Sequence, residues 1–367
     1  HTATPPTSPT AVEQTPQEIV TQLIAAKLKA MEEQDIDAYL SLIDACDNEY
    51  YTEQRNWFLH YQEAITAEYS IEIKQVERID DSTLVSTLEH RYLYGPEKTV
   101  RQFENRQKFV LTPDGWKDAD LAFEVIETPH FTIKYQPELE AKAAEVAEEA
   151  EIGYSSVVSV LGLEAPEKVT IKLYATEELL RQSTDIRVAF LFSGWYEEGE
   201  SIKLFGLRDR NAFAQVIAHE LTHLITLGIS DSQTIWLAEG LGVYFGNRPF
   251  RGGNPIELGQ YTAEDLALPV TWLEETNLIE VTDGETVSLY YALSGMVVEF
   301  MVDTYGIDQA KALLAELSTF PRWDRGFDYG PMEVENQARL HQAMETVLGL
   351  DQETFNRQWL EWIGAQD

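Results

Sequence analysis

The chain has 367 residues and a formal net charge of −36 at pH 7, from 63 acidic and 27 basic residues. Such an acidic chain argues against binding to nucleic acid or to anionic membranes, because both partners attract basic patches. Its single cysteine, Cys46, excludes an intrachain disulfide and a cysteine-rich zinc site. A hydrophobic content of 44% indicates a folded protein, and the length suffices for two domains.

Residues 1–14 are predicted to form a flexible tether, because the opening stretch is rich in Pro and Thr and lacks bulky aliphatic side chains. This composition resembles the spacer that follows a secretory signal or lipoprotein anchor in Gram-positive bacteria. We therefore expect a secreted or cell-surface bacterial protein, which this linker could tether to the surface. No run of about 18 apolar residues occurs, so no membrane span is expected.

The next part of the chain, 15–128, changes from helical to strand-like patterning. Helices are predicted at 16–31, 36–44 and 50–65, and strands at 69–76, 83–94, 101–112 and 116–125, with a Pro-Asp-Gly turn before the last strand. Three helices followed by a curved antiparallel sheet resemble the NTF2-like (cystatin-like) α+β cone. We expect a spacer or partner-binding domain, and its aromatic residues either line a pocket or fill the core.

A second domain is predicted from 129 to 367. Strands are expected at 130–135, 169–174, 194–196 and 201–207, with an Ala/Glu-rich helix at about 138–161 between the first two. The later patterns are almost all helical. The predicted fold class is therefore α+β, and this domain should have a small mixed sheet and a mainly helical C-terminal half.

The motif His219-Glu220-Leu-Thr-His223 lies within an apolar helical pattern. Two histidines four residues apart leave the same face of a helix and can bind one metal ion. Glu220 is displaced by about 100° around the helix, where it can act as a base without ligating the metal. The alternative is a helix with ordinary polar positions, but a His-Glu pair in so apolar a segment would be costly to bury without a partner.

A third metal ligand is predicted at Glu239, in a second apolar and aromatic helix at 234–247. Its neighbours indicate burial, and an unpaired buried carboxylate would be costly or protonated, whereas a metal ligand is satisfied. Two histidines, one carboxylate and an open position for water are typical of a catalytic zinc site, so one Zn²⁺ is expected.

The pairing of H-E-x-x-H with a downstream W-L-x-E-G-L resembles the gluzincin peptidases, most closely the bacterial peptidase-MA-like families. The resemblance covers about 128–367 and implies that His219, His223 and Glu239 bind zinc and that Glu220 is the catalytic base. Where the metzincin pattern requires Gly and His after the motif, the chain has Thr226 and Ile229. The G-x-M-E-N signature of the large gluzincin aminopeptidases is missing as well.

The same resemblance implies two further site features. A tyrosine on a late helix stabilises the oxyanion in related peptidases, and Tyr290 and Tyr291 are adjacent candidates that the sequence cannot separate from each other or from a packing role. The strand before the metal helix borders the cleft in such folds. An extended peptide substrate could then pair with the strand at 201–207, through Ser201, Lys203 and Phe205.

The predicted function is hydrolysis of peptide bonds in a peptide or protein substrate, with Glu220 activating a water at the zinc. Two alternatives remain open. One is a non-catalytic cell-surface binding protein that keeps a peptidase fold. The other is a zinc hydrolase that acts on a non-peptide amide, because both reactions begin with attack on a carbonyl.

Overall fold

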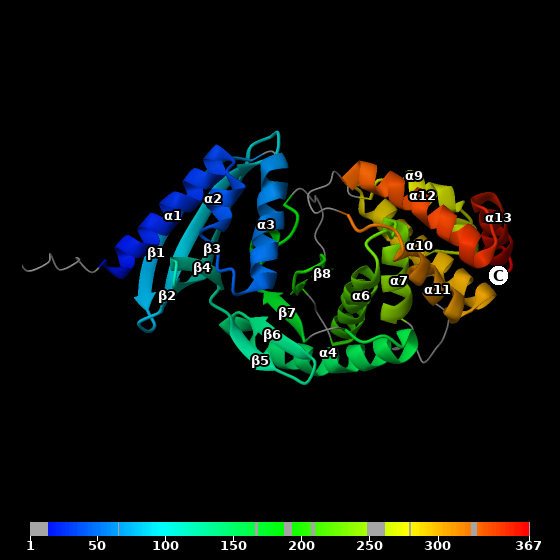
Figure 1. Ribbon diagram of the computed structural model, residues 1–367, viewed down its shortest axis with the longest axis horizontal. Helices are drawn as coiled ribbons and strands as arrows, with labels where there is room; N and C mark the ends of the chain where they lie inside the picture. The colour runs from blue at the N-terminus through cyan, green and yellow to red at the C-terminus, as the bar shows by residue number, and fades with distance from the viewer. Residues whose placement is uncertain are drawn as a thin grey trace, which may run out of the picture. The chain divides into compact units, whose positions relative to one another are not determined.

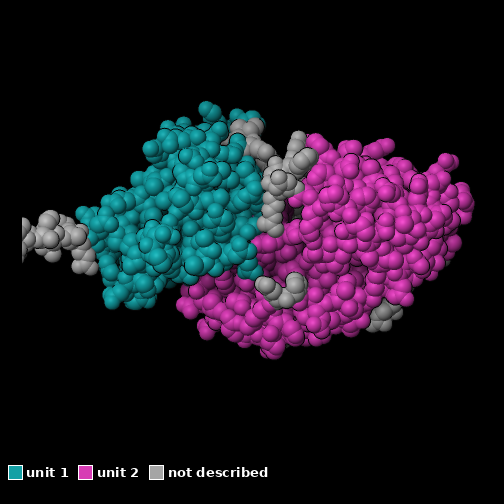
Figure 2. All heavy atoms as spheres, viewed as in Figure 1, with its two compact units in different colours: residues 1–122 teal, residues 123–367 magenta. Residues whose placement is uncertain are grey.

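The computed structural model describes residues 14–64, 66–165, 168–186, 193–206, 210–247, 261–278, 280–323 and 329–366. The chain divides into two compact units, residues 1–122 and 123–367 (Figures 1 and 2). Each unit has helices and a sheet of its own, which confirms the α+β class. The predicted tether at 1–14 lies outside the described residues except for Gln14.

Unit 1 has three helices followed by a four-stranded antiparallel sheet, in the order that the sequence predicts. The sheet order is β1-β2-β3-β4. Ile19, Val20 and Ile24 of the first helix pack against Leu84 and Leu88 of the sheet. The elements are α1 (Pro16–Glu33), α2 (Ile36–Leu40), α3 (Asn48–Glu63), β1 (Thr66–Arg78), β2 (Thr83–Tyr94), β3 (Thr99–Thr112) and β4 (Gly115–Leu121).

The boundary between the units differs from the predicted one at 128/129. The strand predicted at 116–125 ends as β4 at Leu121, and the chain then forms β5 (Glu124–Glu127). β5 pairs with β6 (Phe131–Tyr135) in the second sheet, so unit 2 begins at Phe123. Local alternation does not distinguish one long strand from two strands that join different sheets.

A chain of hydrogen bonds crosses the interior of unit 1. The Asn105 amide Nδ2 donates to Gln107 Oε1 at 3.0 Å, so Asn105 Oδ1 is free to accept from His90 Nε2 at 3.3 Å. The Tyr69 hydroxyl then donates to His90 Nδ1 at 3.1 Å. At the other end, Gln107 Nε2 donates to Asp118. His90 is therefore held as a neutral imidazole with a partner at each nitrogen.

Acid is expected to destabilise unit 1 through His90. Burial, and secondarily the nearby Lys27 ammonium, lower the pKa of His90 from 6.5 to about 3. Between these two pH values the unfolded chain binds a proton that the folded chain does not, so the free energy of unfolding decreases as the pH falls, by about 1.4 kcal/mol per pH unit. Thermal unfolding of the wild type and of His90→Gln over this range measures the effect. The variant should lose less of its melting temperature on acidification, and equal acid sensitivity would contradict the assignment.

Unit 2 is built on a five-stranded mixed sheet in the order β5-β6-β7-β9-β8. The central strands β6, β7 and β9 are parallel, and β8 is antiparallel to β9. The elements up to the end of the sheet are η1 (Pro137–Leu139), α4 (Glu140–Leu161), β7 (Val169–Tyr174), α5 (Glu177–Arg181), β8 (Gly194–Trp195) and β9 (Ile202–Phe205).

The rest of unit 2 is helical in the described residues, as predicted for the C-terminal half. No described helix is both long and apolar enough to cross a membrane. The helices are α6 (Arg210–Ile229), α7 (Ile235–Asn247), α8 (Ala263–Leu266), α9 (Val270–Glu275), α10 (Gly284–Tyr305), α11 (Ile307–Leu317), α12 (Tyr329–Leu348) and α13 (Gln352–Ile363).

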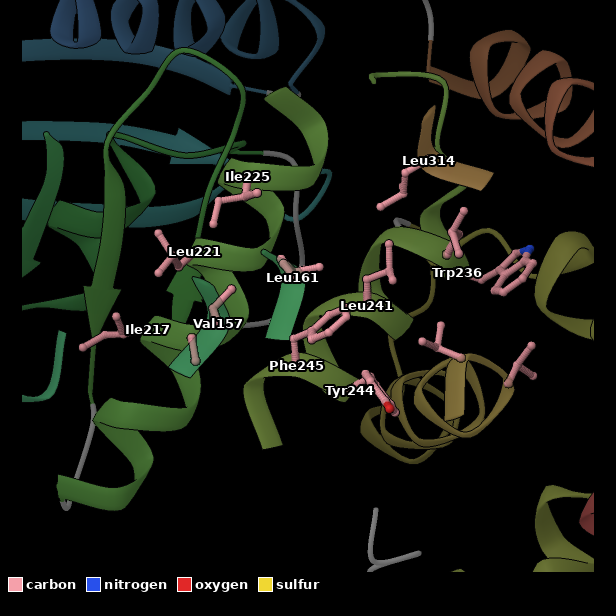
Figure 3. Packing of buried hydrophobic residues seen from close by; sticks show 14 of the residues in the cluster. Val157, Leu161, Ile217, Leu221, Ile225, Trp236, Leu241, Tyr244, Phe245 and Leu314 are labelled. Carbon is pink, nitrogen blue, oxygen red and sulfur yellow. The ribbon is translucent and has the colours of Figure 1, made fainter. Parts of the chain in front are cut away.

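The core of unit 2 holds α6 in place. Ile217, Leu221 and Ile225 recur along one side of α6 and cluster with Val157 and Leu161 of α4 (Figure 3). This spacing is that of an amphipathic helix, and burial of these side chains fixes the rotation of α6 about its axis. The same cluster contains most of the apolar residues of α7 and α10. The polar side chains of α6 and α7 that lie between these apolar positions are therefore held in fixed directions.

Candidate metal centre

Three side chains from α6 and α7 converge in unit 2. His219 and His223 lie one turn apart on α6, and Glu239 extends from α7. The two imidazole Nε2 atoms are 2.9 Å apart, and Glu239 Oε2 lies 3.1 Å from His219 Nε2 and 3.5 Å from His223 Nε2. These are the three residues that the sequence singles out as metal ligands, and within the described residues they are the one cluster of this kind.

The donor atoms have the spacing that a tetrahedral metal requires. Bonds of about 2.0–2.1 Å at tetrahedral angles separate neighbouring ligand atoms by about 3.3 Å. The observed separations, 2.9–3.5 Å, bracket that value. Two neutral imidazoles and one carboxylate are also the donor set that suits Zn²⁺ and leaves a fourth position open. The residues therefore fit such an ion in number, chemistry and spacing.

The three side chains are largely enclosed but can be reached from solvent. Their exposed fractions are 18% for His219, 9% for His223 and 19% for Glu239. Burial alone would raise the pKa of Glu239, but in the metal-free protein the electrostatic attraction of His223 and hydrogen bonds from both histidines hold it well below its usual range. Glu239 is therefore ionised, as a metal ligand must be.

Side chains of α12 form hydrogen bonds with the buried loop between α6 and α7. The Asn336 amide of α12 donates to the Gln233 carbonyl at 2.9 Å, and the Glu333 carboxylate accepts from the Ile235 amide at 3.2 Å. Burial raises the pKa of Glu333 to about 8. Unpaired backbone groups in a buried loop are costly, so these contacts stabilise one path for the chain between the two helices.

Glu220 lies beside the three ligand side chains without joining them. It is buried, and this burial, more than any neighbouring charge, raises its pKa to about 7 in the metal-free protein. A Cβ atom built on Gly194 of β8 would lie 2.5 Å from Glu220 Oε1. The carboxylate therefore rests against the backbone of β8 at a position that only glycine leaves open. Sequence reasoning missed Gly194, although a glycine in a predicted strand is a signal of close approach.

The strand next to the centre is β8, not β9 as the resemblance implied. β9 lies between β7 and β8, whereas β8 pairs only with β9 among the described strands, so β8 is the edge. Ser201 and Lys203 are buried, and the Lys203 ammonium is paired with Glu200; Phe205 is partly buried. These three residues are therefore not presented to a substrate by a free strand edge. Strand order depends on long-range pairing, which β-propensity does not reveal.

The two adjacent tyrosines of α10 have different surroundings. The ring centroid of Tyr291 lies 6.1 Å from that of His219. Burial, followed by the negative charges of Glu239 and Glu220, raises the pKa of Tyr291 well above its usual value. Tyr290 is fully buried and lies 6.3 Å from the ring of Trp272. The structure therefore brings Tyr291 to the centre and places Tyr290 in the core.

Comparison of the sequence with protein-family models and with curated proteins finds no match.

Proposed function

We propose that the chain is a zinc-dependent peptidase whose active site lies on α6 and α7. One observation carries the proposal: two imidazole nitrogens and one carboxylate oxygen on adjacent helices lie 2.9–3.5 Å from one another. A second acid, Glu220, is buried beside them. A two-histidine, one-carboxylate site with a neighbouring buried carboxyl group is the arrangement that metal-assisted hydrolysis requires.

Each of the chain's own residues has a distinct part in this reaction. Bound zinc would supply a Lewis acid for the scissile carbonyl and for a water molecule. Glu220 would take a proton from the attacking water and deliver it to the leaving amine. Tyr291, whose raised pKa keeps its hydroxyl protonated, would donate a hydrogen bond to the developing oxyanion.

Replacing Tyr291 with phenylalanine is expected to lower kcat by about a hundredfold, the usual effect of removing one oxyanion donor. Zinc content should stay unchanged because Tyr291 is not among the ligands. Tyr290→Phe is the matched control, since it removes the same hydroxyl one residue away in the core. Steady-state kinetics of both variants on one peptide would decide. Equal losses in the two would remove Tyr291 from the reaction.

An extended peptide is the substrate that the site favours. We propose that the peptide binds in extended form beside Gly194, because the absence of a side chain there brings the backbone of β8 against Glu220.

Three wider assignments are also proposed. Membership of unit 2 in the gluzincin peptidases rests on the H-E-x-x-H and W-L-x-E-G-L motifs. The NTF2-like assignment of unit 1 rests on the order of its helices and strands. Export to the cell surface rests on the composition of residues 1–14.

The deciding experiment combines zinc analysis with proteolysis. Elemental analysis of the purified protein should give one equivalent of zinc, and degradation of an unstructured protein should stop on addition of a chelator and resume with added zinc. Zinc without proteolysis would favour the binding-protein alternative, and chelator-sensitive hydrolysis of small amides alone would favour the non-peptide hydrolase. Absence of metal after reconstitution would refute the centre.

A further inference from the structure

Helix α7 approaches the metal centre at a glycine as well as at Glu239. Gly242 follows Glu239 by three residues, so both lie on the side of α7 that faces α6. A Cβ atom built on Gly242 would lie 2.6 Å from Cε1, 2.8 Å from Nδ1 and 2.8 Å from Nε2 of His219. Real Cβ atoms are not found so close to other atoms. The His219 imidazole therefore rests on the α7 backbone where only glycine fits.

Gly242 contacts the imidazole ring of His219 and not only the backbone of α6. Three atoms of one imidazole surround the Gly242 position at nearly equal distances, so a face of the ring leans on it. At Gly246, one turn later, the nearest atoms are backbone atoms of α6, the closest being Gln215 O at 3.1 Å. Gly246 therefore packs against the backbone of α6, as is usual where two helices lie close together. Gly242 instead packs against a side chain, the His219 imidazole.

Contacts on its other sides restrict the imidazole further. The ring centroid of His223 lies 4.6 Å from that of His219, at an interplanar angle of 82°, and that of Tyr291 lies 6.1 Å away. In this orientation His219 Nε2 points to His223 Nε2, 2.9 Å away, and to Glu239 Oε2, 3.1 Å away. A methyl group at residue 242 would displace the ring from this orientation, because the atoms nearest to it are those of the His219 imidazole.

We propose that Gly242 is a positioning residue of the metal centre. The absence of a side chain there lets the His219 imidazole lie at the angle at which its Nε2 joins the other two donors. A glycine inside a helix is disfavoured relative to alanine, so the helix itself gives no reason for it. This inference rests on the proposed metal site. It states that Gly242 determines the orientation of His219, one of the proposed ligands.

Zinc affinity tests the proposal directly. Dissociation constants would be measured by competition with a chromophoric chelator for the wild type, Gly242→Ala and Gly228→Ala. The first variant should bind zinc about 10- to 100-fold more weakly, as when a group that orients a ligand is lost. Gly228→Ala is the control in α6, because a methyl group there meets nothing within 4 Å. Equal affinity of Gly242→Ala and a zinc-binding wild type would overturn this inference alone, whereas a wild type without zinc would overturn the metal centre itself.

A stability cycle in metal-free protein tests the contact without reference to function. Thermal unfolding would compare Gly242→Ala in the wild type and in a His219→Ala background. The substitution should lower the melting temperature in the wild type, and leave it unchanged or raise it once the imidazole is gone. A Gly242→Ala protein that fails to fold, with folding restored by His219→Ala, supports the same contact. Equal effects in both backgrounds would show that the methyl group meets something else, and would refute the assignment.

Discussion

Peptide hydrolysis is expected to fall by a factor of about 10² to 10⁴ when Glu220 is replaced by glutamine, the range of a lost general base. Glutamine keeps the shape and most of the packing of the side chain but cannot accept the proton of the attacking water. The position of Glu220 supports this role, because the side chain is buried against β8 and beside the three proposed ligands.

The zinc content of Glu220→Gln separates a catalytic role from a structural one. Since Glu220 is not one of the three converging donors and burial disfavours its charge, the variant should retain one equivalent of zinc and a melting temperature no lower than that of the wild type. Lost activity together with lost zinc would mean that the residue holds the centre together. Unchanged activity would exclude Glu220 from the reaction.

Replacing Glu239 with alanine is expected to weaken zinc binding by more than about a hundredfold, which exceeds the cost of losing a group that merely orients a ligand. The variant removes one of only three protein donors, and also the charge that lies 3.1 Å and 3.5 Å from the two imidazoles. Zinc remaining after dialysis against a weak chelator is the measurement.

Glu239→Gln provides a graded control. The amide retains an oxygen donor of the same reach without the negative charge, so its zinc affinity should lie between those of the wild type and the alanine variant. Full zinc content in Glu239→Ala would place the third ligand elsewhere in the chain.

The three proposed metal ligands are the most predictable part of the candidate site from sequence. The four-residue spacing of His219 and His223 predicts that both side chains lie on the same face of a helix. The apolar neighbours of Glu239 predict that its side chain is buried. Each of these inferences uses only residues within one or two turns of helix. The same local reasoning correctly predicted the α+β class and most helices.

The features that escaped prediction depend on contacts between distant segments. Tyr290 and Tyr291 are indistinguishable by local sequence, and only the packing of α10 turns one of them toward His219. β8 is a two-residue strand whose edge position follows from the pairing order of five strands. The role of Gly194 can be recognised only once the backbone of β8 is known to lie against the Glu220 side chain. Periodicity carries no information on any of these.

The position of all three proposed ligands within one helical hairpin has a consequence for the order of folding. His219, His223 and Glu239 are separated by at most 20 residues, so the loop that must close to bring them together is short and its entropic cost is small. Tyr291 of α10 reaches the same place through a longer loop. A nascent α6–α7 hairpin could therefore bind the proposed ion before α10 docks, and the ion would then favour the hairpin over the open chain. Capture of the metal and competence for catalysis would arise at separate stages of folding.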